Sequence, residues 1–379
     1  MDFKLTEEQE LIRASAREFA LKYLEPIAAE IDEESRFPME VMTKLAEMDW
    51  LGIPYPAEYG GAGADYLTFA LVVEEISRSC ASTGFTLSAT TGLVMNPIYQ
   101  FGTEEQKKQY ITPIAKGEKI GAFALTEPGA GTDPGAATTT AVLEGDTYVI
   151  NGTKTFISNG PIADVFVVIA VTDKSKGARG LSGFIVPKEA GGISVGKHFQ
   201  KMGLRASQTS EIIFKDCRIP RQNLLGKEGQ GFRIAMQSLD TGRIGIAAQA
   251  IGILQAALDE SISYSKERVQ FGKPISVNQA IQWMLVDMAT DLAAARFLTY
   301  YAADCKDKGL PSSKEAAMAK LFASEAVSRH ASKAVQIHGG IGYVKGTKVE
   351  RLMRDAKITE IYEGTSEAQR MVIAGNILR

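Results

Sequence analysis

The spacing of apolar residues divides the chain into three segments, of which the first is helical. From Thr6 to about Lys119, apolar side chains recur every three or four positions, for example Ile12, Ala16, Phe19, Ala20 and Tyr23. This period places them on one face of an α-helix. The stretch Pro54–Gly63, rich in glycine and proline, interrupts the pattern and predicts a loop. We therefore expect an all-α domain over residues 1–119.

The second segment changes to a pattern typical of β-strands. Between Gly121 and about Gly226, runs of β-branched and aromatic residues, such as 164–171 and 181–186, are separated by turn residues. Asn151-Gly152 lies between the strand-like runs 147–150 and 155–157, and Asn-Gly is a strong signal for a two-residue hairpin turn. These features predict a small antiparallel β domain over residues 120–229.

The third segment, residues 230–379, is helical again. Long amphipathic runs near 233–266, 277–307 and 314–336 predict a four-helix bundle with an oligomer interface on its outer faces. The apolar stretch Ile244–Leu258 is shorter than the roughly 20 residues that span a bilayer, so we interpret it as a buried helix. An α+β fold in the order helical, antiparallel β, helical differs from the alternating strands and helices of most nucleotide-dependent oxidoreductases.

Composition and charge exclude several classes of partner. The 45 acidic and 42 basic residues are mixed along the chain, so no broad basic surface is expected for nucleic acid or for an anionic membrane. The three cysteines lie far apart and form no zinc or disulfide pattern, which fits a reducing compartment. The segment Met1–Gln9 becomes charged and amphipathic at once and lacks the features of a signal peptide. We therefore expect a cytoplasmic protein without membrane segments.

The first candidate site is the loop Thr126–Asp133, with the sequence TEPGAGTD. Its closely spaced glycines and hydroxyls would let backbone N–H groups approach a phosphate or an aromatic cofactor. Gly129 and Gly131 begin a G-x-G pattern, but Pro134 stands where a dinucleotide fingerprint needs its third glycine, which argues against a nicotinamide site. Taken alone, the loop fits an ordinary glycine-rich turn better than a cofactor site.

The second candidate is the segment Asn151–Gly160, with the sequence NGTKTFISNG. If it forms a strand after the predicted turn, Phe156 and Ser158 lie on the same face, two residues apart. An aromatic ring and a hydroxyl would suit the face and the edge of a flavin ring. A core phenylalanine beside a solvated serine fits the pattern equally well.

The third candidate is the C-terminal segment Arg354–Arg370, which contains the run IYEGT at 361–365. Together with the loop at 126–133 and the run QIHGGIGY at 336–343, in this order, it resembles the acyl-CoA dehydrogenase family over essentially the whole chain. The stretch 239–249, LDTGRIGIAAQ, looks most like the short-chain, butyryl-CoA branch. The resemblance implies FAD as the cofactor, a short-chain acyl-CoA as the substrate and electron-transfer flavoprotein as the electron acceptor.

The resemblance also implies the catalytic base. The glutamate of the Tyr-Glu-Gly-Thr run removes the substrate α-proton in this family while the β-hydrogen leaves as a hydride to flavin N5, and the matching residue here is Glu363. By the same match, the Glu363 backbone N–H and a ribityl hydroxyl of FAD would stabilise the enolate oxygen, and Gly364 would let the thioester approach the backbone. Some members carry the base at the position of Gly242, where glycine cannot serve. By residue type alone, Glu363 would also fit an exposed loop or helix-cap carboxylate, as Glu360 does.

The remaining site residues follow from the same match. The resemblance implies flavin contacts in the β segment and more weakly at the C-terminal run: Phe123, Leu125, Thr126, Thr132, Phe156, Ser158, Thr365 and Glu367. Phe156 stands where many relatives have tryptophan. A second set would hold the pyrophosphate and adenosine of the FAD of a neighbouring subunit: Arg268, Phe271, Gln279, Gln336, Gly339 and Gly340. Binding of FAD would then require a homo-oligomer, and the family implies a tetramer.

Substrate contacts are implied for Thr132, Gly364, Asp240 and Arg243, the last two near the CoA moiety. Arg243 would supply a fixed cation, although a salt bridge with Asp240 at the start of a helix explains the spacing equally well. Three other functions stay open at this point: an enoyl-CoA reductase, a flavin oxidase, and a catalytically silent flavoprotein that keeps the fold for protein contacts. The intact base disfavours the silent flavoprotein, and glutamate rather than aspartate at position 363 disfavours the oxidase.

Overall fold

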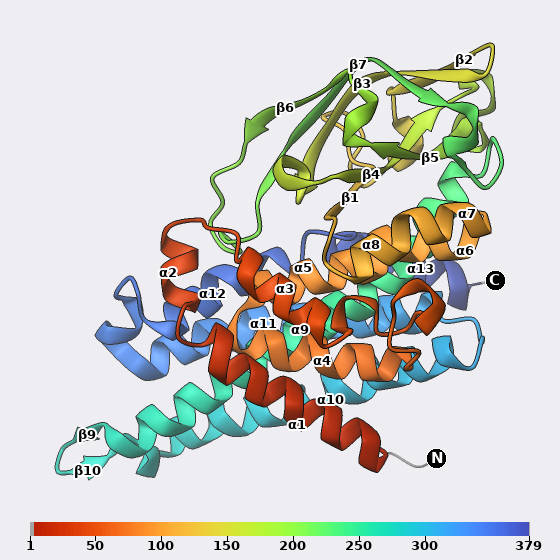
Figure 1. Cartoon of the computed structure of the whole chain (residues 1–379). Helices are drawn as coiled ribbons and strands as arrows, with labels where there is room; N and C mark the ends of the chain where they lie inside the picture. Colours follow the sequence, from red (N-terminus) through yellow and green to blue (C-terminus); the bar gives the residue numbers. More distant parts are fainter. Residues whose placement is uncertain (1–3, 379) are drawn as a thin grey trace.

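A computed structural model describes residues 4–378 and confirms the predicted order of helical, β and helical parts (Figure 1). In Figure 1 the β part, at the top, covers one side of a thick layer of helices drawn from both ends of the chain. Residues 1–3 and residue 379 lie outside the described residues. The first three belong to the N-terminal segment on which the prediction of a cytoplasmic protein rests, and residue 379 ends the third predicted domain. The fold class is therefore α+β, with the sheet between two helical parts in sequence but beside them in space.

The first helical part contains two long helices and several short ones. Helix α1 begins after Thr6, whose side chain accepts a hydrogen bond from the Gln9 N–H while the Gln9 side chain accepts one from the Thr6 N–H. The helices of this part are α1 (Glu7–Phe19), α2 (Ala28–Glu33), α3 (Met39–Glu47), α4 (Tyr66–Ser79), α5 (Ala81–Ala89), α6 (Asn96–Phe101), α7 (Glu104–Gln106) and α8 (Thr112–Ala115). A π-helical turn, η4 (Thr90–Met95), joins α5 to α6 and is entirely buried.

The middle part is one sheet with the order β6-β7-β3-β2-β4-β5-β8, and β1 pairs with β4 outside this path. Its strands are β1 (Gly121–Ala124), β2 (Thr140–Glu144), β3 (Thr147–Ser158), β4 (Val165–Val171), β5 (Leu181–Pro187), β6 (Ile193–His198), β7 (Thr209–Pro220) and β8 (Leu224–Leu225). Most neighbours are antiparallel, as predicted, but β4 runs parallel to β1 and to β2. Strand β4 is buried over almost its whole length because the sheet has apolar clusters on both sides.

The predicted turn at Asn151-Gly152 is wrong. Strand β3 runs through both residues, and the turn that precedes it is Gly145-Asp146, where Gly145 has a φ of +61°. At Gly152 the pairing of β3 with β7 shifts register, and a Cβ there would lie 2.4 Å from Thr139 Oγ1. Glycine is needed at this position for the close approach of a neighbouring chain segment, and sequence alone does not separate that need from the need of a tight turn.

The third part follows the three predicted helical runs closely. Its helices are α9 (Gly231–Glu267), α10 (Gln279–Asp307), α11 (Ser313–His338), α12 (Lys348–Ile358) and α13 (Ser366–Ile377). The stretch Ile244–Leu258 lies inside α9 and is almost fully buried, which confirms its interpretation as a buried helix. A short hairpin, β9 (Val269–Gln270) and β10 (Lys273–Pro274), separates α9 from α10 and projects from one end of the helical layer (Figure 1).

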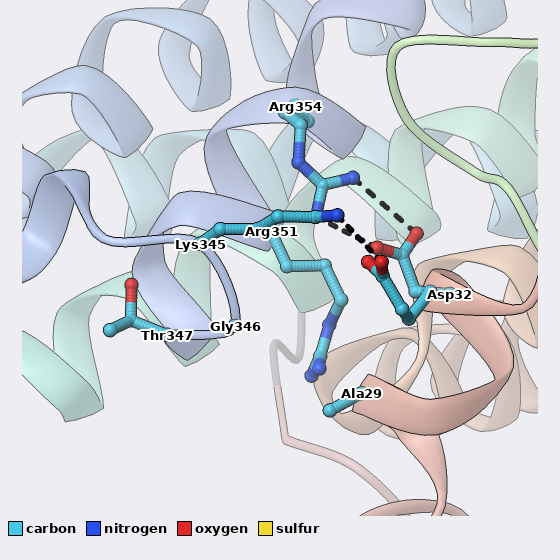
Figure 2. A pocket seen from close by; sticks show the side chains of 8 residues that line it. Ala29, Asp32, Lys345, Gly346, Thr347, Arg351 and Arg354 are labelled. Carbon is cyan, nitrogen blue, oxygen red and sulfur yellow. Dashed lines mark hydrogen bonds and ion pairs between the residues drawn. The ribbon is translucent and has the colours of Figure 1, made fainter.

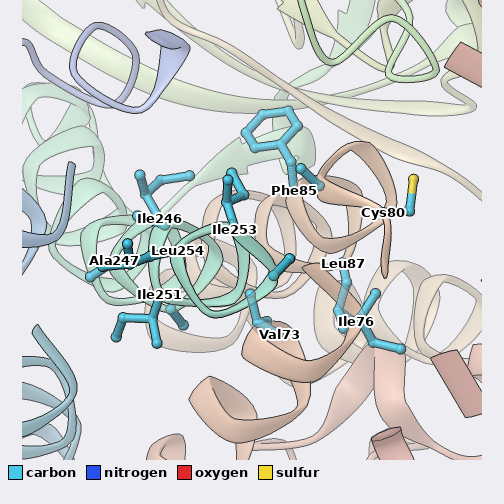
Figure 3. Packing of buried hydrophobic residues seen from close by; sticks show 14 of the residues in the cluster. Val73, Ile76, Cys80, Phe85, Leu87, Ile246, Ala247, Ile251, Ile253 and Leu254 are labelled. Carbon is cyan, nitrogen blue, oxygen red and sulfur yellow. The ribbon is translucent and has the colours of Figure 1, made fainter. Parts of the chain in front are cut away.

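The main hydrophobic core joins the two helical parts into one body. Helix α9 passes between α4 and α5 of the first part and α10 and α11 of the third. In Figure 3, Val73 of α4 and Leu87 of α5 lie beside α9, whose Ile246, Ile253 and Leu254 belong to the same buried cluster. Burial of side chains of this size contributes about 1.5–3 kcal/mol each. The two helical segments therefore form one framework, and α9 runs through its centre.

Candidate active site

Glu363 lies in a strained turn between α12 and α13. Its φ is +52°, in the left-handed region that non-glycine residues rarely occupy, and Gly364 follows with a φ of +96°. The Gln369 side chain donates hydrogen bonds to the carbonyl oxygens of Glu363 (3.2 Å) and Gly364 (2.8 Å). Thr365 then caps α13 by accepting a hydrogen bond from the Ala368 N–H. Strain of this kind persists only where surrounding contacts hold it, as they do here.

The Glu363 carboxyl group points into the protein. Part of the residue is exposed, yet both carboxyl oxygens are buried and lack a hydrogen-bond partner. Burial raises the pKa of this carboxyl group from its ordinary value of 4.5 to about 8, against the opposing charges of Lys320 and Arg243. A carboxylate that is desolvated and not hydrogen-bonded has the properties of a general base that works near neutral pH. The alternative of an exposed loop carboxylate does not describe Glu363.

The space that receives this carboxyl group is provided by a glycine. A Cβ at Gly242 of α9 would lie 1.8 Å from Glu363 Oε2 and 3.0 Å from Leu93 Cδ2. No larger residue fits at position 242 unless the carboxyl group moves. The glycine at the alternative base position is therefore also required for the packing of the Glu363 carboxyl group.

Arg243 and Asp240 form the local ion pair that the sequence left open. Arg243 Nη1 lies 2.6 Å from Asp240 Oδ1, and the Ser313 hydroxyl donates a second hydrogen bond to the same oxygen. The pair lies well inside α9, which begins at Gly231, and not at a helix start. Burial raises the pKa of Asp240 despite the adjacent guanidinium group. Arg243 Nε is buried and has no partner, so part of its donor capacity is unused.

Two groups that sequence reasoning did not identify hold the surroundings of Glu363. Lys320 of α11 is fully buried, and its Nζ donates to the Gly364 carbonyl oxygen at 2.7 Å. The Tyr362 hydroxyl hydrogen-bonds to Gln249 of α9, and the Tyr362 ring stacks on Phe85 at 4.9 Å between centroids. A lysine in an alanine-rich helix carries no recognisable motif, so only the three-dimensional arrangement reveals it.

A buried ion pair anchors the glycine-rich loop at 126–133 through Glu127. Lys154 Nζ lies 2.8 Å from Glu127 Oε1, and neither side chain is more than 3% exposed. Glu127 also accepts hydrogen bonds from the backbone N–H groups of Thr138 and Thr139. Burial acts to raise the pKa of Glu127, but Lys154 and these hydrogen bonds outweigh it and lower the pKa to about 2. The loop is therefore held in place by buried contacts and is not merely a surface turn, and Lys154 is a further residue that sequence reasoning missed.

Strand β1, which leads into the loop, and Gly242, which faces Glu363, share a neighbour, the turn η4. Leu93 of η4 faces Gly242, while Val94 of η4 faces Gly121, where a Cβ would lie 2.3 Å from Val94 Cγ1. Gly121 begins β1, which carries the predicted flavin contact Phe123 and leads into the loop. Leu125, Thr126 and Thr132 follow it, and Thr132 is exposed. The β1 end of the sheet and the base are thus adjacent to the same buried turn.

Phe156 is placed differently from the expectation. It has a φ of +56° and lies where the pairing of β3 with β7 shifts register, so the two-residue alternation with Ser158 does not apply. The Phe156 side chain is 62% exposed and its ring stacks on Phe199 at 4.6 Å between centroids. It is therefore not a core phenylalanine. Ser158 is partly exposed and pairs in register with Thr209 of β7.

The second predicted cofactor set lies at another end of the protein. Arg268 and Phe271 belong to the hairpin β9-β10, Gln279 begins α10, and Gln336 with Gly339 and Gly340 lies at the end of α11. A surface hollow lies between the end of α9 and the end of α11 and is lined by Tyr264, Glu267 and His338, among others; the His338 ring stacks on Tyr264. Phe271 is fully exposed. Figure 1 shows this hairpin far from the sheet that carries Phe156.

These residues fit a flavin nucleotide in two respects. An exposed aromatic ring at Phe156 is available for a planar partner, and Gly129 and Gly131 have open space where a Cβ would stand. Thr365 caps α13 through its own hydroxyl, and Glu367 is exposed in the first turn of that helix. Arg268 and Phe271 are exposed and offer a guanidinium group and a ring, which are groups that can bind a phosphate and a planar partner.

Another hollow of the surface lies elsewhere. A pocket of ≈ 320 Å³ between α2 and the segment 345–354 is lined by paired charges: Figure 2 shows Arg354 directed at Asp32, with Nη2 and Oδ2 2.7 Å apart. The ion pair joins α12 to α2, and Glu363 is not among the residues that line this pocket.

Within residues 4–378, no group of three or more histidine, cysteine or acidic side chains is arranged to hold a metal ion. In the same range no helix combines the length and hydrophobicity needed to cross a membrane.

Comparison with known families and structures follows the three parts of the chain. Family models described as the acyl-CoA dehydrogenase N-terminal, middle and C-terminal domains match residues 6–118, 122–217 and 229–378. A short-chain specific acyl-CoA dehydrogenase of Clostridium acetobutylicum is 55% identical over 379 residues, which are 100% of both chains. An acryloyl-CoA reductase (NADH) of Anaerotignum propionicum is 51% identical over 381 residues, covering 100% of this chain and 96% of the relative.

Solved structures agree with this relationship. The butyryl-CoA dehydrogenase of Megasphaera elsdenii has a TM-score of 0.98 and 47% identity, with full coverage of both chains. A chain in the structure of an electron transferring flavoprotein of Acidaminococcus fermentans has a TM-score of 0.99 and 53% identity, again with full coverage.

Proposed function

This chain belongs to the acyl-CoA dehydrogenase family of FAD-dependent oxidoreductases that act on CH–CH bonds, and on that premise we propose that it oxidises a short-chain acyl-CoA to the trans-2-enoyl-CoA with Glu363 as the base. One observation carries the assignment of the base. The Glu363 carboxyl oxygens are buried, have no hydrogen-bond partner and face Gly242, so that the pKa of the group is raised to about 8.

The chemistry of the thioester explains why such a group is needed. The α-proton of an acyl thioester is weakly acidic, so the base must be desolvated and must have a pKa near the working pH. Glu363 would accept the α-proton on a carboxyl oxygen, and the left-handed turn would hold that oxygen in a fixed direction. Gly364 has no side chain to block the thioester from the backbone beside the base.

FAD, when bound, supplies the acceptor for the β-hydride. We assign its ring to the surface formed by Phe156, Ser158 and the loop at 126–133, and its phosphates to backbone N–H groups of that loop and to Arg268 of a neighbouring subunit. The ion pair of Lys154 with Glu127 would keep the loop in place. Arg243, with an unused buried Nε–H, and Asp240 would lie near the CoA moiety.

A homo-oligomer follows from the separation of the two cofactor sets. Phe271, Trp283, Val286 and Tyr343 are large apolar side chains that are each at least 60% exposed, on or near the second set. Exposed apolar patches of this kind mark protein contacts. We propose that these surfaces meet a second copy, in a tetramer, and bring Arg268 to the FAD of the partner.

The test of the reaction is an anaerobic titration. The purified protein is expected to be yellow, and butyryl-CoA should bleach the flavin without oxygen, whereas Glu363→Gln should retain FAD and bind the ligand but lose at least about three orders of magnitude in turnover. Activity of Glu363→Gln within about tenfold of wild type would reject the base. Rapid re-oxidation of the bleached flavin in air would indicate an oxidase, and absence of bleaching would indicate a silent flavoprotein.

The short-chain preference is tested with acyl-CoAs of graded length. Each added methylene that fits would contribute about 0.8 kcal/mol of burial, so affinity alone should rise with length. We expect kcat/KM to peak near the four-carbon substrate and to fall steeply by eight carbons, because a closed pocket excludes the longer chains. A profile still rising at eight carbons would reject the short-chain assignment but not the chemistry of Glu363.

The reverse reaction is the second candidate, because one close relative is named as an acryloyl-CoA reductase. The likeness to a chain in an electron transferring flavoprotein structure favours such a flavoprotein as the electron partner in either direction. Consumption of enoyl-CoA with reduced electron transferring flavoprotein, faster than the forward reaction at equal concentrations, would favour the reductase. A cytoplasmic location likewise stays a prediction.

A further inference from the structure

Lys320 is a charged side chain in an apolar environment. It is fully buried in the first third of α11, where Ala316, Ala317, Ala319 and Ala323 are also buried. Its Nζ donates one hydrogen bond, to the Gly364 carbonyl oxygen at 2.7 Å. A buried ammonium group is unfavourable unless charges or acceptors offset its desolvation. Its retention here therefore calls for an explanation within its surroundings.

Lys320 and Gln369 hold the turn of the base from two sides. Both donate to the Gly364 carbonyl oxygen, at 2.7 Å and 2.8 Å, and they come from different helices, α11 and α13. The turn contains two successive residues with positive φ, Glu363 and Gly364. Because such a conformation is unfavourable for glutamate in isolation, donors on the following carbonyl favour it over a relaxed turn.

The charges around the base are few. Of the two cations that oppose the effect of burial on the pKa of Glu363, Lys320 on α11 has the larger effect, followed by Arg243 on α9. Lys320 in turn faces Glu363, Glu360 and Glu367 as acidic groups and Arg243 as a cation, and burial lowers its pKa to about 8. Arg243 is already paired with Asp240, so Lys320 is the cation whose charge is least compensated by other direct contacts.

We propose that Lys320 is a positioning residue for the catalytic base: its ammonium group clamps the Gly364 carbonyl, fixes the turn that directs the Glu363 carboxyl group at Gly242, and supplies the positive charge that favours the carboxylate form. The inference rests on the proposed function only in naming Glu363 as the base. The clamp and its electrostatic effect exist whether or not the protein dehydrogenates an acyl-CoA.

The sign of the effect follows from the charges. Burial raises the pKa of the Glu363 carboxyl group, and a cation beside the group lowers it. Without Lys320, part of this lowering is lost, so the pKa of Glu363 should rise above about 8. The carboxylate is the proton acceptor. Removal of the cation should therefore shift the rise of activity with pH to higher pH and reduce turnover near neutrality.

Three variants of the holoenzyme separate the two roles. Lys320→Met removes both donor and charge, Lys320→Gln keeps a donor but removes the charge, and Lys320→Arg keeps both. Lys333→Met, on the same helix but paired with Asp287 at the surface, is the matched control. Flavin content and circular dichroism check the fold of each variant.

The primary measurement is the protonation of Glu363 itself, obtained by infrared difference titration of each variant against the same variant carrying Glu363→Gln. We expect the carboxyl titration to move upward by about one pH unit or more in Lys320→Met and Lys320→Gln, and to stay near wild type in Lys320→Arg and Lys333→Met. The acid limb of the kcat profile should move with it. Turnover at pH 7 should fall about tenfold or more, and further in Lys320→Met than in Lys320→Gln.

An unchanged carboxyl titration in folded Lys320→Gln would overturn the electrostatic role, and equal kcat in Lys320→Met and Lys320→Gln would overturn the clamp. If Lys320→Met does not fold, Lys320→Gln and Lys320→Arg still decide the electrostatic part, and Lys320→Leu then replaces Lys320→Met for the clamp. Because the titration needs no turnover, a shifted titration in an enzyme without dehydrogenase activity would refute the proposed function and leave this inference standing.

Discussion

The buried carboxyl group of Glu363 should make the wild-type protein less stable as the pH rises. Its pKa is raised from 4.5 to about 8 in the folded protein, so between these values the folded state binds more protons than the unfolded state. Stability then falls with pH across this window and the loss is complete above about pH 8. At about 1.4 kcal/mol per pH unit, the accumulated penalty is at most roughly 5 kcal/mol.

Glu363→Gln removes this titration and keeps the shape of the side chain. The amide brings its own cost of burial without partners, but that cost does not depend on pH. We therefore expect the difference in Tm between the variant and wild type to widen in favour of the variant from pH 5.5 to pH 8. With about 2 °C per kcal/mol for a large chain, the widening should reach several degrees.

The assay is thermal unfolding followed by flavin fluorescence and calorimetry at equal protein and FAD concentrations, since ligand and oligomer equilibria also move Tm. Glu360→Gln is the matched control: its carboxylate pairs with Lys357 near the surface, so the variant loses an ion pair and relieves no buried charge. A Tm difference for Glu363→Gln that is constant from pH 5.5 to pH 8, or that favours wild type at pH 8, would refute the argument from burial.

Three further outcomes are expected. Gly242→Ala should lose most activity, because the added Cβ would lie 1.8 Å from a carboxyl oxygen of Glu363. The control Gly375→Ala, with open space around the added Cβ, should be active. Equal kcat values for the two variants would contradict the packing argument. Lys154→Met should lose FAD and about 3–5 kcal/mol of stability, because Glu127 is left charged and buried. In assays of flavin retention and of unfolding, the double variant with Glu127→Gln should recover part of the lost FAD binding and part of the lost stability. Arg268→Ala should weaken FAD retention and oligomerisation together, and a stable, flavin-replete monomer in light scattering would contradict a cofactor shared between subunits.

The periodicity of apolar residues was sufficient for the outline of the fold. The runs at 233–266, 277–307 and 314–336 correspond to α9, α10 and α11 within a few residues, because a long amphipathic helix repeats the same local signal over many turns. The same local logic failed at Asn151-Gly152. There the glycine allows the close approach of a neighbouring chain segment and does not form a turn, and the residue that approaches, Thr139, lies outside a short sequence window around it.

The sequence by itself also singled out Glu363 as the candidate base, since the motif around it can be found without coordinates. Only the tertiary structure decided the surroundings on which that proposal rests: Gly242 lies opposite the carboxyl group and Lys320 beside its turn, from helices far away in the sequence. The same holds for Lys154 beneath the loop at 126–133. Local pattern determines secondary structure because backbone hydrogen bonds and side-chain periodicity are short-range, whereas desolvation and Coulomb energy depend on whichever groups the fold brings within a few ångströms.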